Sequence, residues 1–233
     1  MHYLFTPQIL EPETYIGGEE WQHCRVLRLR EGETVVLVDG QGLKCRAELS
    51  FSGRSEGRFR ILDRQTVPPA RPYRLTLLIA PTKQMERLEW CLEKVTEIGV
   101  DAIVPIICRR SERRQLRIDR LERVVQAAMK QSQQAWLPKV HEAVELEDWL
   151  KANPLTSTDQ GLIAHCFDAV PPTILEQRAA DKHVFIAIGP EGDFTPEEVA
   201  PVLAGGWLPV NLGPTRLRTE TAGVVAVTLL NWK

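Results

Sequence analysis

Short β-type runs alternate with glycine-containing turns over the first 66 residues. The runs cover residues 34–38, 43–51 and 57–62, and the turns between them cover residues 39–42 and 52–53. Apolar and β-branched runs of this length, bounded by Gly, Asp and Ser, are typical of strands joined by hairpins. This part of the chain therefore predicts a small all-β barrel or sandwich.

A proline-rich segment separates this β-rich part from the remainder of the chain. Residues 67–72 contain three prolines, and proline disfavours both the helix interior and the β-ladder. We therefore expect a linker here, between a first domain of residues 1–68 and a second domain of residues 73–233.

Beyond the linker, strand-like and helix-like hydrophobic periods alternate. Residues 75–80 are almost entirely apolar, as in a strand buried on both faces. From Met85 to Ile98 apolar side chains recur every three or four positions, which predicts a helix that ends at Gly99. Further strands are expected at 100–107, 162–164, 183–188 and 207–212, and helices near 117–134 and 196–203. This alternation predicts an α/β layer structure with a mostly parallel sheet.

Length and composition exclude several protein classes. The chain has 233 residues, 43% of them hydrophobic, and a formal net charge of −2, which predicts one or two globular domains with a sizeable core. No apolar stretch approaches the roughly 20 residues of a membrane span, and the N-terminus lacks the pattern of a signal peptide. No cysteine pair has the spacing of a metal or redox motif, so we expect reduced thiols, no metal and a cytoplasmic protein. The five cysteines are Cys24, Cys45, Cys91, Cys108 and Cys166.

The stretch 188–199 joins a strand end, a Gly-Pro turn and a helix start. Thr195 suits the N-cap, Pro196 the first helical position and Glu198 the reciprocal carboxylate of a capping box. Phe194 and Val199 have the spacing of a hydrophobic staple. The helix start therefore has a purely structural explanation, whereas the preceding turn 189–192 carries two glycines that let a ligand approach bare backbone.

A second loop of the same kind covers residues 212–222, between an expected strand and an apolar run. Arg218, Glu220 and three threonines crowd this loop. One interpretation is a helix cap with a solvated Arg–Glu pair, because exposed ion pairs are common and weak. The other is a binding pocket, because two such loops that follow two strands of one sheet meet at its carboxyl edge.

Basic residues gather in two places on a nearly neutral chain. Seven arginines and three acidic residues lie between Arg109 and Arg123. A second group, from Lys44 to Arg64, has six basic and three acidic residues. Either group could be a solvated surface with internal ion pairs. The alternative is a long polyanion that touches both domains, because arginine forks match phosphate oxygens.

With these motifs in view, the chain resembles the RsmE-type ribosomal RNA methyltransferases of the SPOUT superfamily almost from end to end. The residues that carry the resemblance are His23-Cys24-Arg25-Val26-Leu27-Arg28, Val38-Asp39-Gly40-Gln41-Gly42, Lys94-Val95-Thr96-Glu97-Ile98-Gly99-Val100, Ile188-Gly189-Pro190-Glu191-Gly192, Leu212-Gly213-Pro214 and Leu217-Arg218-Thr219-Glu220-Thr221-Ala222. The resemblance implies a PUA-like β-barrel domain that helps to hold RNA and a C-terminal SPOUT α/β domain with a trefoil knot. It also implies a homodimer that uses S-adenosylmethionine to methylate ring nitrogen 3 of a uridine in 16S ribosomal RNA of the small ribosomal subunit.

Site residues follow from the resemblance, position by position. The residues expected to surround the cofactor are Gly189, Pro190, Glu191, Gly192, Leu212, Gly213, Leu217, Arg218, Thr219, Thr221 and Ala222. The candidates for RNA contact are His23, Arg25, Arg28, Arg110, Arg113 and Arg114. Val26, Leu27 and Leu29, between these side chains, are expected to pack. His165, a lone histidine just after an expected strand, is taken as structural.

The chain departs from the family pattern at three places. Gln133-Gln134 stands where relatives often have Gly-Arg, Asp193 replaces a frequent third glycine, and Thr215 takes the place of an arginine that appears one position later as Arg216. These departures affect the RNA contacts and the charge of the pocket.

Methyl transfer to a uridine nitrogen requires alignment and removal of the imide proton. Arg218 is the candidate that stabilises the resulting negative charge. Glu220 would either accept the proton or fix Arg218, and the second role is slightly favoured because an ion-paired carboxylate is a poorer base.

Two other functions fit part of the pattern. One is a non-catalytic RNA-binding protein of ribosome assembly. The other is a phosphate- or nucleotide-binding enzyme that uses the turn 189–192, although Glu191 and Asp193 would repel an anion there.

Overall fold

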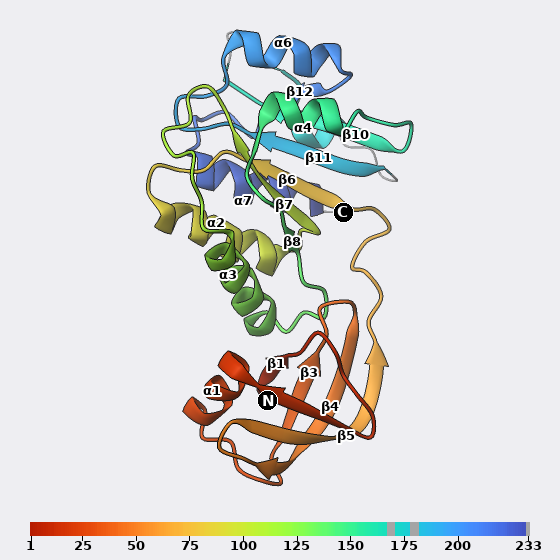
Figure 1. Cartoon of the computed structure of the whole chain (residues 1–233). Coiled ribbons are helices and arrows are strands. Elements are labelled where there is room, and N and C mark those ends of the chain that lie inside the picture. Colours follow the sequence, from red (N-terminus) through yellow and green to blue (C-terminus); the bar gives the residue numbers. More distant parts are fainter. Residues whose placement is uncertain (167–170, 178–181, 232–233) are drawn as a thin grey trace. The chain divides into compact units, whose positions relative to one another are not determined.

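The computed structural model describes residues 1–166, 171–177 and 182–231, and the chain divides into two compact units (Figure 1). The first unit holds Met1–Ala70 and Gln126–Leu137, and the second holds Arg71–Val125 and Pro138–Lys233. The sequence-based limits place residues 126–137 in the second domain, whereas the structure groups them with the first unit. The border between the units therefore falls inside helix α3 (Ile118–Gln131).

The first unit is built on a five-stranded sheet in the order β1-β3-β4-β5-β2. Its strands are β1 (Tyr3–Phe5), β2 (Glu13–Gly17), β3 (Thr34–Val38), β4 (Leu43–Ser52) and β5 (Glu56–Thr66). The three strand runs expected here are confirmed as β3, β4 and β5, which form an antiparallel meander. Gly42, at a φ of +99°, supplies the left-handed conformation that the turn between β3 and β4 needs.

The first unit also contains a helix that the β-type pattern did not predict. Helix α1 spans Gly18–Val26 and buries only Trp21 and Cys24. With only two buried positions, α1 shows no clear helical repeat of apolar residues, so the hydrophobic pattern did not predict it. Gly57 of β5 accommodates the Trp21 ring, because a Cβ there would lie 2.2 Å from a ring carbon. The expectation that Val26 packs is wrong: Val26 is 77% exposed at the end of α1.

The second unit is a seven-stranded sheet in the order β12-β10-β11-β6-β7-β8, with β9 also paired to β7. Its strands are β6 (Leu75–Ile79), β7 (Ala102–Ile107), β8 (Lys139–Val140), β9 (Val144–Glu145), β10 (Asp159–Ala164), β11 (His183–Ile188) and β12 (Leu208–Val210). The pairings among the described residues are all parallel, which confirms the predicted parallel α/β sheet.

Different helices cover the two faces of this sheet (Figure 1). Its helices are α2 (Met85–Ile98), α4 (Leu146–Ala152), α5 (Ile174–Gln177), α6 (Pro196–Ala204) and α7 (Thr219–Asn231). Leu78 and Ala80 pack with residues of α4 and α6 in one core cluster. Leu77 and Ile79 point to the opposite face, against α7.

Close packing of α7 depends on a glycine. A Cβ at Gly223 would lie 2.9 Å from Cys91 Sγ of α2 and 3.0 Å from Ile79 Cδ1 of β6. The missing side chain thus lets α7 approach both elements. In the part of the chain that the structure describes, every helix is too short or too polar to cross a membrane.

Candidate active site

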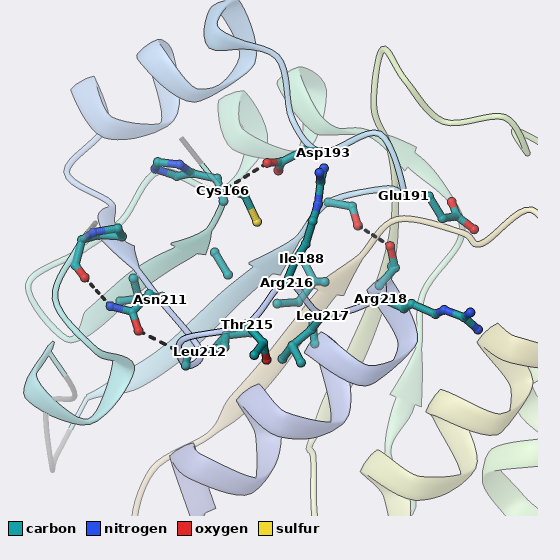
Figure 2. Close-up of a pocket in the computed structure, with 18 of the residues that line it drawn as sticks. Cys166, Ile188, Glu191, Asp193, Asn211, Leu212, Thr215, Arg216, Leu217 and Arg218 are labelled. Carbon is teal, nitrogen blue, oxygen red and sulfur yellow. Dashed lines mark hydrogen bonds between the residues drawn. The ribbon is translucent and has the colours of Figure 1, made fainter. Parts of the chain in front are cut away.

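A cavity of about 600 Å³ lies where three adjacent parallel strands end (Figure 2). Ala164 ends β10 and Ile188 ends β11, while Val210 ends β12, and all three residues line the cavity. The carboxyl ends of parallel strands meet at one edge of a sheet, where loops converge on ligands. The prediction that two such loops share a pocket is confirmed: the glycine-proline loop (residues 189–195) and the arginine loop (residues 211–218) both line it.

Most residues that the resemblance assigns to the cofactor line this cavity. They are Gly189, Pro190, Glu191, Leu212, Gly213, Leu217, Arg218, Thr219 and Ala222. Gly192 and Thr221 are the two that do not. Gly192 lies beside Arg110 instead, whose Nη1 donates to the Gly192 carbonyl at 2.7 Å. Thr221 lines a neighbouring cavity, one residue beyond Glu220.

A buried threonine joins the two loops. Thr219 is 4% exposed, and its hydroxyl donates to the carbonyl of Gly189 at 3.0 Å (dashed in Figure 2). These two residues are 30 positions apart, so this bond holds the start of α7 against the end of β11. Its loss would free both walls of the cavity.

The glycine-proline loop is held at its far end by the predicted capping box. The Glu198 backbone N–H donates to Thr195 Oγ1 at 3.3 Å, and the Thr195 N–H donates to Glu198 Oε2 at 2.8 Å. Pro196 is the first helical residue. Glu198 Oε1 also accepts from the backbone N–H of Arg109 at 2.7 Å. This buried carboxylate therefore ties α6 to the loop after β7, a contact that the local pattern did not indicate.

Asp193, one of the departures from the family pattern, connects the glycine-proline loop to the end of β10. Its φ is +63°, a conformation that Asp tolerates better than most residues. Its Oδ2 accepts from the Cys166 N–H at 2.9 Å (Figure 2), and its Oδ1 accepts from the Phe194 N–H at 2.8 Å. A glycine at this position would adopt this φ without strain. Asp193 instead gains two hydrogen bonds to backbone N–H groups through its carboxylate.

His165, which the sequence analysis took as structural, lines the cavity next to Cys166. Burial lowers the pKa of its imidazole below the usual value, and the nearby Asp193 carboxylate opposes this shift. At neutral pH the ring is therefore predominantly uncharged. The strand before it was predicted, so its place at the carboxyl edge was the signal available for finding it.

The arginine loop is shaped by Asn211, which sequence reasoning also missed. Asn211 Oδ1 accepts from the Gly213 N–H at 3.2 Å, and Asn211 Nδ2 donates to the carbonyl of Pro171 (Figure 2). The expected strand 207–212 is shorter for the same reason: the Asn211 backbone N–H donates to the carbonyl of Pro172 at 3.0 Å, outside the ladder with β10.

Arg218 and Glu220 do not form the ion pair that the sequence suggested. The Arg218 side chain points away from the cavity floor, toward helix α2 (Figure 2). Glu220 is buried, and its Oε1 lies 3.8 Å from Nη1 of Arg87 in α2. Its second oxygen, Oε2, is buried with no hydrogen-bond partner among the described residues. The preferred role of Glu220 as the group that fixes Arg218 is therefore wrong; Arg87 is its partner.

Several arginines that follow β7 bind other residues of the second unit through their guanidinium groups. Arg113 donates to the carbonyl of Lys83 at 2.9 Å, and Arg114 Nη2 lies 2.6 Å from Glu145 Oε1. Arg120 pairs with Glu89 at 2.5 Å. This group is therefore largely a surface with internal partners, one of the two alternatives that its composition allowed.

In the first unit, the arginines of the strands are ion-paired, whereas the RNA-contact candidates in α1 and just after it are exposed. Arg46 pairs with Asp63, Arg60 lies 3.0 Å from Glu48, and Arg64 lies 2.7 Å from Glu11. His23, Arg25 and Arg28 are exposed, and they form no ion pair with any residue of the described ranges. Arg25 donates only to the carbonyl of Arg54, at 3.5 Å.

All five cysteines are free thiols, and burial raises the pKa of Cys91 to about 12. Within residues 1–166, 171–177 and 182–231, no group of three or more His, Cys, Asp or Glu side chains is arranged to hold a metal ion.

Comparison with known proteins identifies the family. Residues 69–231 match the RNA methyltransferase domain family, and residues 16–62 match the RNA methyltransferase PUA domain family. Ribosomal RNA small subunit methyltransferase E of Mycobacterium bovis is 33% identical over 227 residues, covering 91% of this chain and 82% of that protein. The corresponding protein of Synechocystis is 30% identical, covering 96% and 74%.

Two solved structures are similar to this chain over nearly its whole length. A probable rRNA methyltransferase from Porphyromonas gingivalis is 36% identical, covers 97% of this chain and 95% of its own, and has a TM-score of 0.87. Ribosomal RNA small subunit methyltransferase E from Neisseria gonorrhoeae, bound to S-adenosyl methionine, is 28% identical with the same coverage and a TM-score of 0.89. The chain, with its mixed α/β methyltransferase and PUA domains, therefore belongs to the ribosomal RNA small subunit methyltransferase E family of RNA methyltransferases.

Proposed function

We propose that this protein uses S-adenosylmethionine to methylate ring nitrogen 3 of a specific uridine in 16S ribosomal RNA. The observation that carries the proposal is the convergence of residues 189–191 and 211–219 on one cavity at the carboxyl edge of the sheet. The names of the relatives support an rRNA substrate, and the S-adenosyl methionine bound to the Neisseria protein supports the methyl donor.

The lining of the cavity fits this methyl donor. Its volume of about 600 Å³ falls within the roughly 300–1,000 Å³ of small-molecule sites. Ile188, Val210 and Leu217 offer apolar walls for an adenine ring, and Gly213, at a φ of +134°, exposes bare backbone. The carboxylate of Glu191 tolerates the cationic sulfonium and amino groups, which is the reason to prefer this donor to a nucleotide phosphate.

The reaction needs a methyl source, a proton acceptor and stabilisation of charge. Bound S-adenosylmethionine would supply an electrophilic methyl group, whose bond to sulfur breaks with its electron pair as the bond to N3 forms. Glu220 takes the N3 proton, directly or through a water, because its Oε2 has no other hydrogen-bond partner in the described chain. Arg218 stabilises the negative charge on the uracil carbonyl oxygens through its guanidinium.

The finer fold and assembly are part of the same proposal. Residues 1–68 form a PUA-like β-barrel that holds RNA, and residues 73–233 form a SPOUT domain with a trefoil knot. The matching families support the methyltransferase and PUA assignments, on which this finer description rests. The protein acts as a homodimer in the cytoplasm, where its rRNA or small-subunit substrate is found.

Contact with RNA falls mainly on exposed basic side chains of the first unit. His23, Arg25 and Arg28 are exposed and have no acidic partner among the described residues, so they are available to phosphates. Arg110, Arg113 and Arg114 make a second, weaker contact, because each already bonds within the second unit.

Mass spectrometry of small-subunit rRNA tests the proposal. RNA from cells that lack this protein should lose one N3-methyluridine, and adding back the purified protein with S-adenosylmethionine should restore it. An unchanged set of methylated uridines would contradict the assignment and leave the non-catalytic RNA-binding alternative.

A further inference from the structure

A second cavity, of about 620 Å³, lies beside the proposed cofactor cavity. Arg216, Leu217 and Arg218 line both cavities, so the two share one wall. The remaining lining comes from one side of helix α2 and the first turn of α7. These residues are Glu86, Arg87, Trp90, Glu220 and Thr221.

A buried carboxylate in this cavity lacks a donor. Glu220 is 7% exposed, and its Oε2 has no hydrogen-bond partner in the described chain. Arg87 lies 3.8 Å from the other oxygen, beyond hydrogen-bond distance. Buried polar atoms are normally paired, and leaving one unpaired is costly. This oxygen is therefore suited to accept a hydrogen bond from a ligand.

The second cavity is also lined by an exposed aromatic ring and by arginine side chains that have no acidic partner among the described residues. Trp90 is 44% exposed, although tryptophan side chains are on average largely buried in folded proteins. The side chains of Arg216 and Arg218 are exposed and form no hydrogen bond or ion pair with the described residues, unlike those of Arg113, Arg114 and Arg120 on the same unit. Aromatic rings stack on unpaired bases, and free guanidinium groups bind phosphates.

We propose that this second cavity receives one unpaired pyrimidine nucleotide of the RNA substrate. Trp90 stacks against the base, Arg216 binds its flanking phosphate, and Glu220 faces the imide N–H. The shared wall places this base next to the methyl donor, which is the geometry that methyl transfer requires. This inference rests on the proposed function and adds the acceptor site with two residues, Trp90 and Arg216, that were not among the site residues predicted from the sequence.

The test measures methyl transfer to small-subunit rRNA from cells that lack this protein, with saturating S-adenosylmethionine. The variants are Trp90→Ala and Trp90→Phe, and the matched control is Ile98→Ala, which removes a similarly exposed apolar side chain of α2 outside the cavity. Trp90→Ala should raise the KM for RNA about 5- to 150-fold, the range for loss of one base–aromatic stack. Trp90→Phe and Ile98→Ala should stay near the wild type.

Arg216→Ala provides a readout that does not depend on the folding of α2. It should raise the KM for RNA and lower the slope of log affinity against log salt by about 0.7, the value for one phosphate contact on a single strand. Arg117→Ala, which removes an exposed arginine paired with Asp119, is its control. Affinity for S-adenosylmethionine, measured by calorimetry, should be unchanged in both Trp90 variants, because Trp90 lines only the second cavity.

Three results would overturn the inference. They are an unchanged KM for RNA in Trp90→Ala and Arg216→Ala, a loss of S-adenosylmethionine affinity in Trp90→Ala, and a fall in the mass of the oligomer in Trp90→Ala. The last would mean that a second copy of the chain covers Trp90. If the wild type itself transfers no methyl group, the proposed function fails and the acceptor site fails with it; an active wild type with unaffected variants refutes the acceptor site alone.

Discussion

Two charged residues two positions apart, Arg218 and Glu220, have different surroundings. Their proximity in sequence suggested a mutual ion pair. In the structure Arg218 is exposed at the wall between two cavities, and Glu220 is buried against Arg87. The sequence could indicate that both belong to a site because they lie in a motif. It could not indicate Arg87, whose position depends on how closely α2 packs against α7.

Replacement of Arg218 by alanine should abolish turnover while folding stays near normal. The side chain is exposed and makes no ion pair or hydrogen bond with the described residues, so its loss removes no internal contact. Loss of one group that stabilises transition-state charge costs about 100- to 1,000-fold in rate. Single-turnover methyl transfer, with the melting temperature as the folding control, measures both effects. Full activity in Arg218→Ala would remove this residue from the mechanism.

Among the helices and strands, the sequence predicted features that depend on neighbouring residues, but not those that depend on pairing between distant segments. The capping box of α6 was predicted because all its parts lie within a few residues, from Thr195 to Glu198. Helix α1 was missed because only Trp21 and Cys24 are buried. The position of β10 between β11 and β12 was also beyond the sequence. That order depends on pairing between segments that are far apart in the sequence. Because β10 lies between β11 and β12, His165, which follows β10, lines the cavity.

The capping box should have a measurable effect on stability. Thr195→Ala removes the hydroxyl that accepts from the Glu198 N–H and should lower the free energy of unfolding by about 1 kcal/mol. Thr195→Ser keeps the hydroxyl and should recover most of this loss. Urea denaturation measures the difference. If Thr195→Ala and Thr195→Ser are equally stable, the hydroxyl does not cap the helix.

For the whole molecule, two units and a parallel sheet could be predicted, but the exact grouping of segments could not. Helix α3 has an uninterrupted period, so nothing in its sequence marks Gln126 as the start of a segment that belongs to the first unit. The arginines between residues 109 and 123 are a similar case. Their composition allowed either a polyanion surface or a solvated surface with ion pairs, and it could not indicate that acids distant in sequence, such as Glu89 and Glu145, pair with them.

Stability of the folded protein should fall as the pH drops below neutral. Burial lowers the pKa of His183 and of His141 below the ordinary value of 6.5. The unfolded chain therefore binds protons at a higher pH than the folded chain does, and protonation favours unfolding. The free energy of unfolding in urea should be lower at pH 5.5 than at pH 7.5. Equal or greater stability at pH 5.5 would contradict the burial of these rings in their neutral form.

Calorimetric titration with S-adenosylmethionine tests the central claim, that the glycine-proline loop and the arginine loop together hold one methyl donor. The wild type should bind one molecule per chain. Thr219→Val, which removes the bond to the Gly189 carbonyl, should weaken binding by at least about fivefold, the equivalent of roughly 1 kcal/mol. No binding to the wild type, or wild-type affinity in Thr219→Val, would contradict the account.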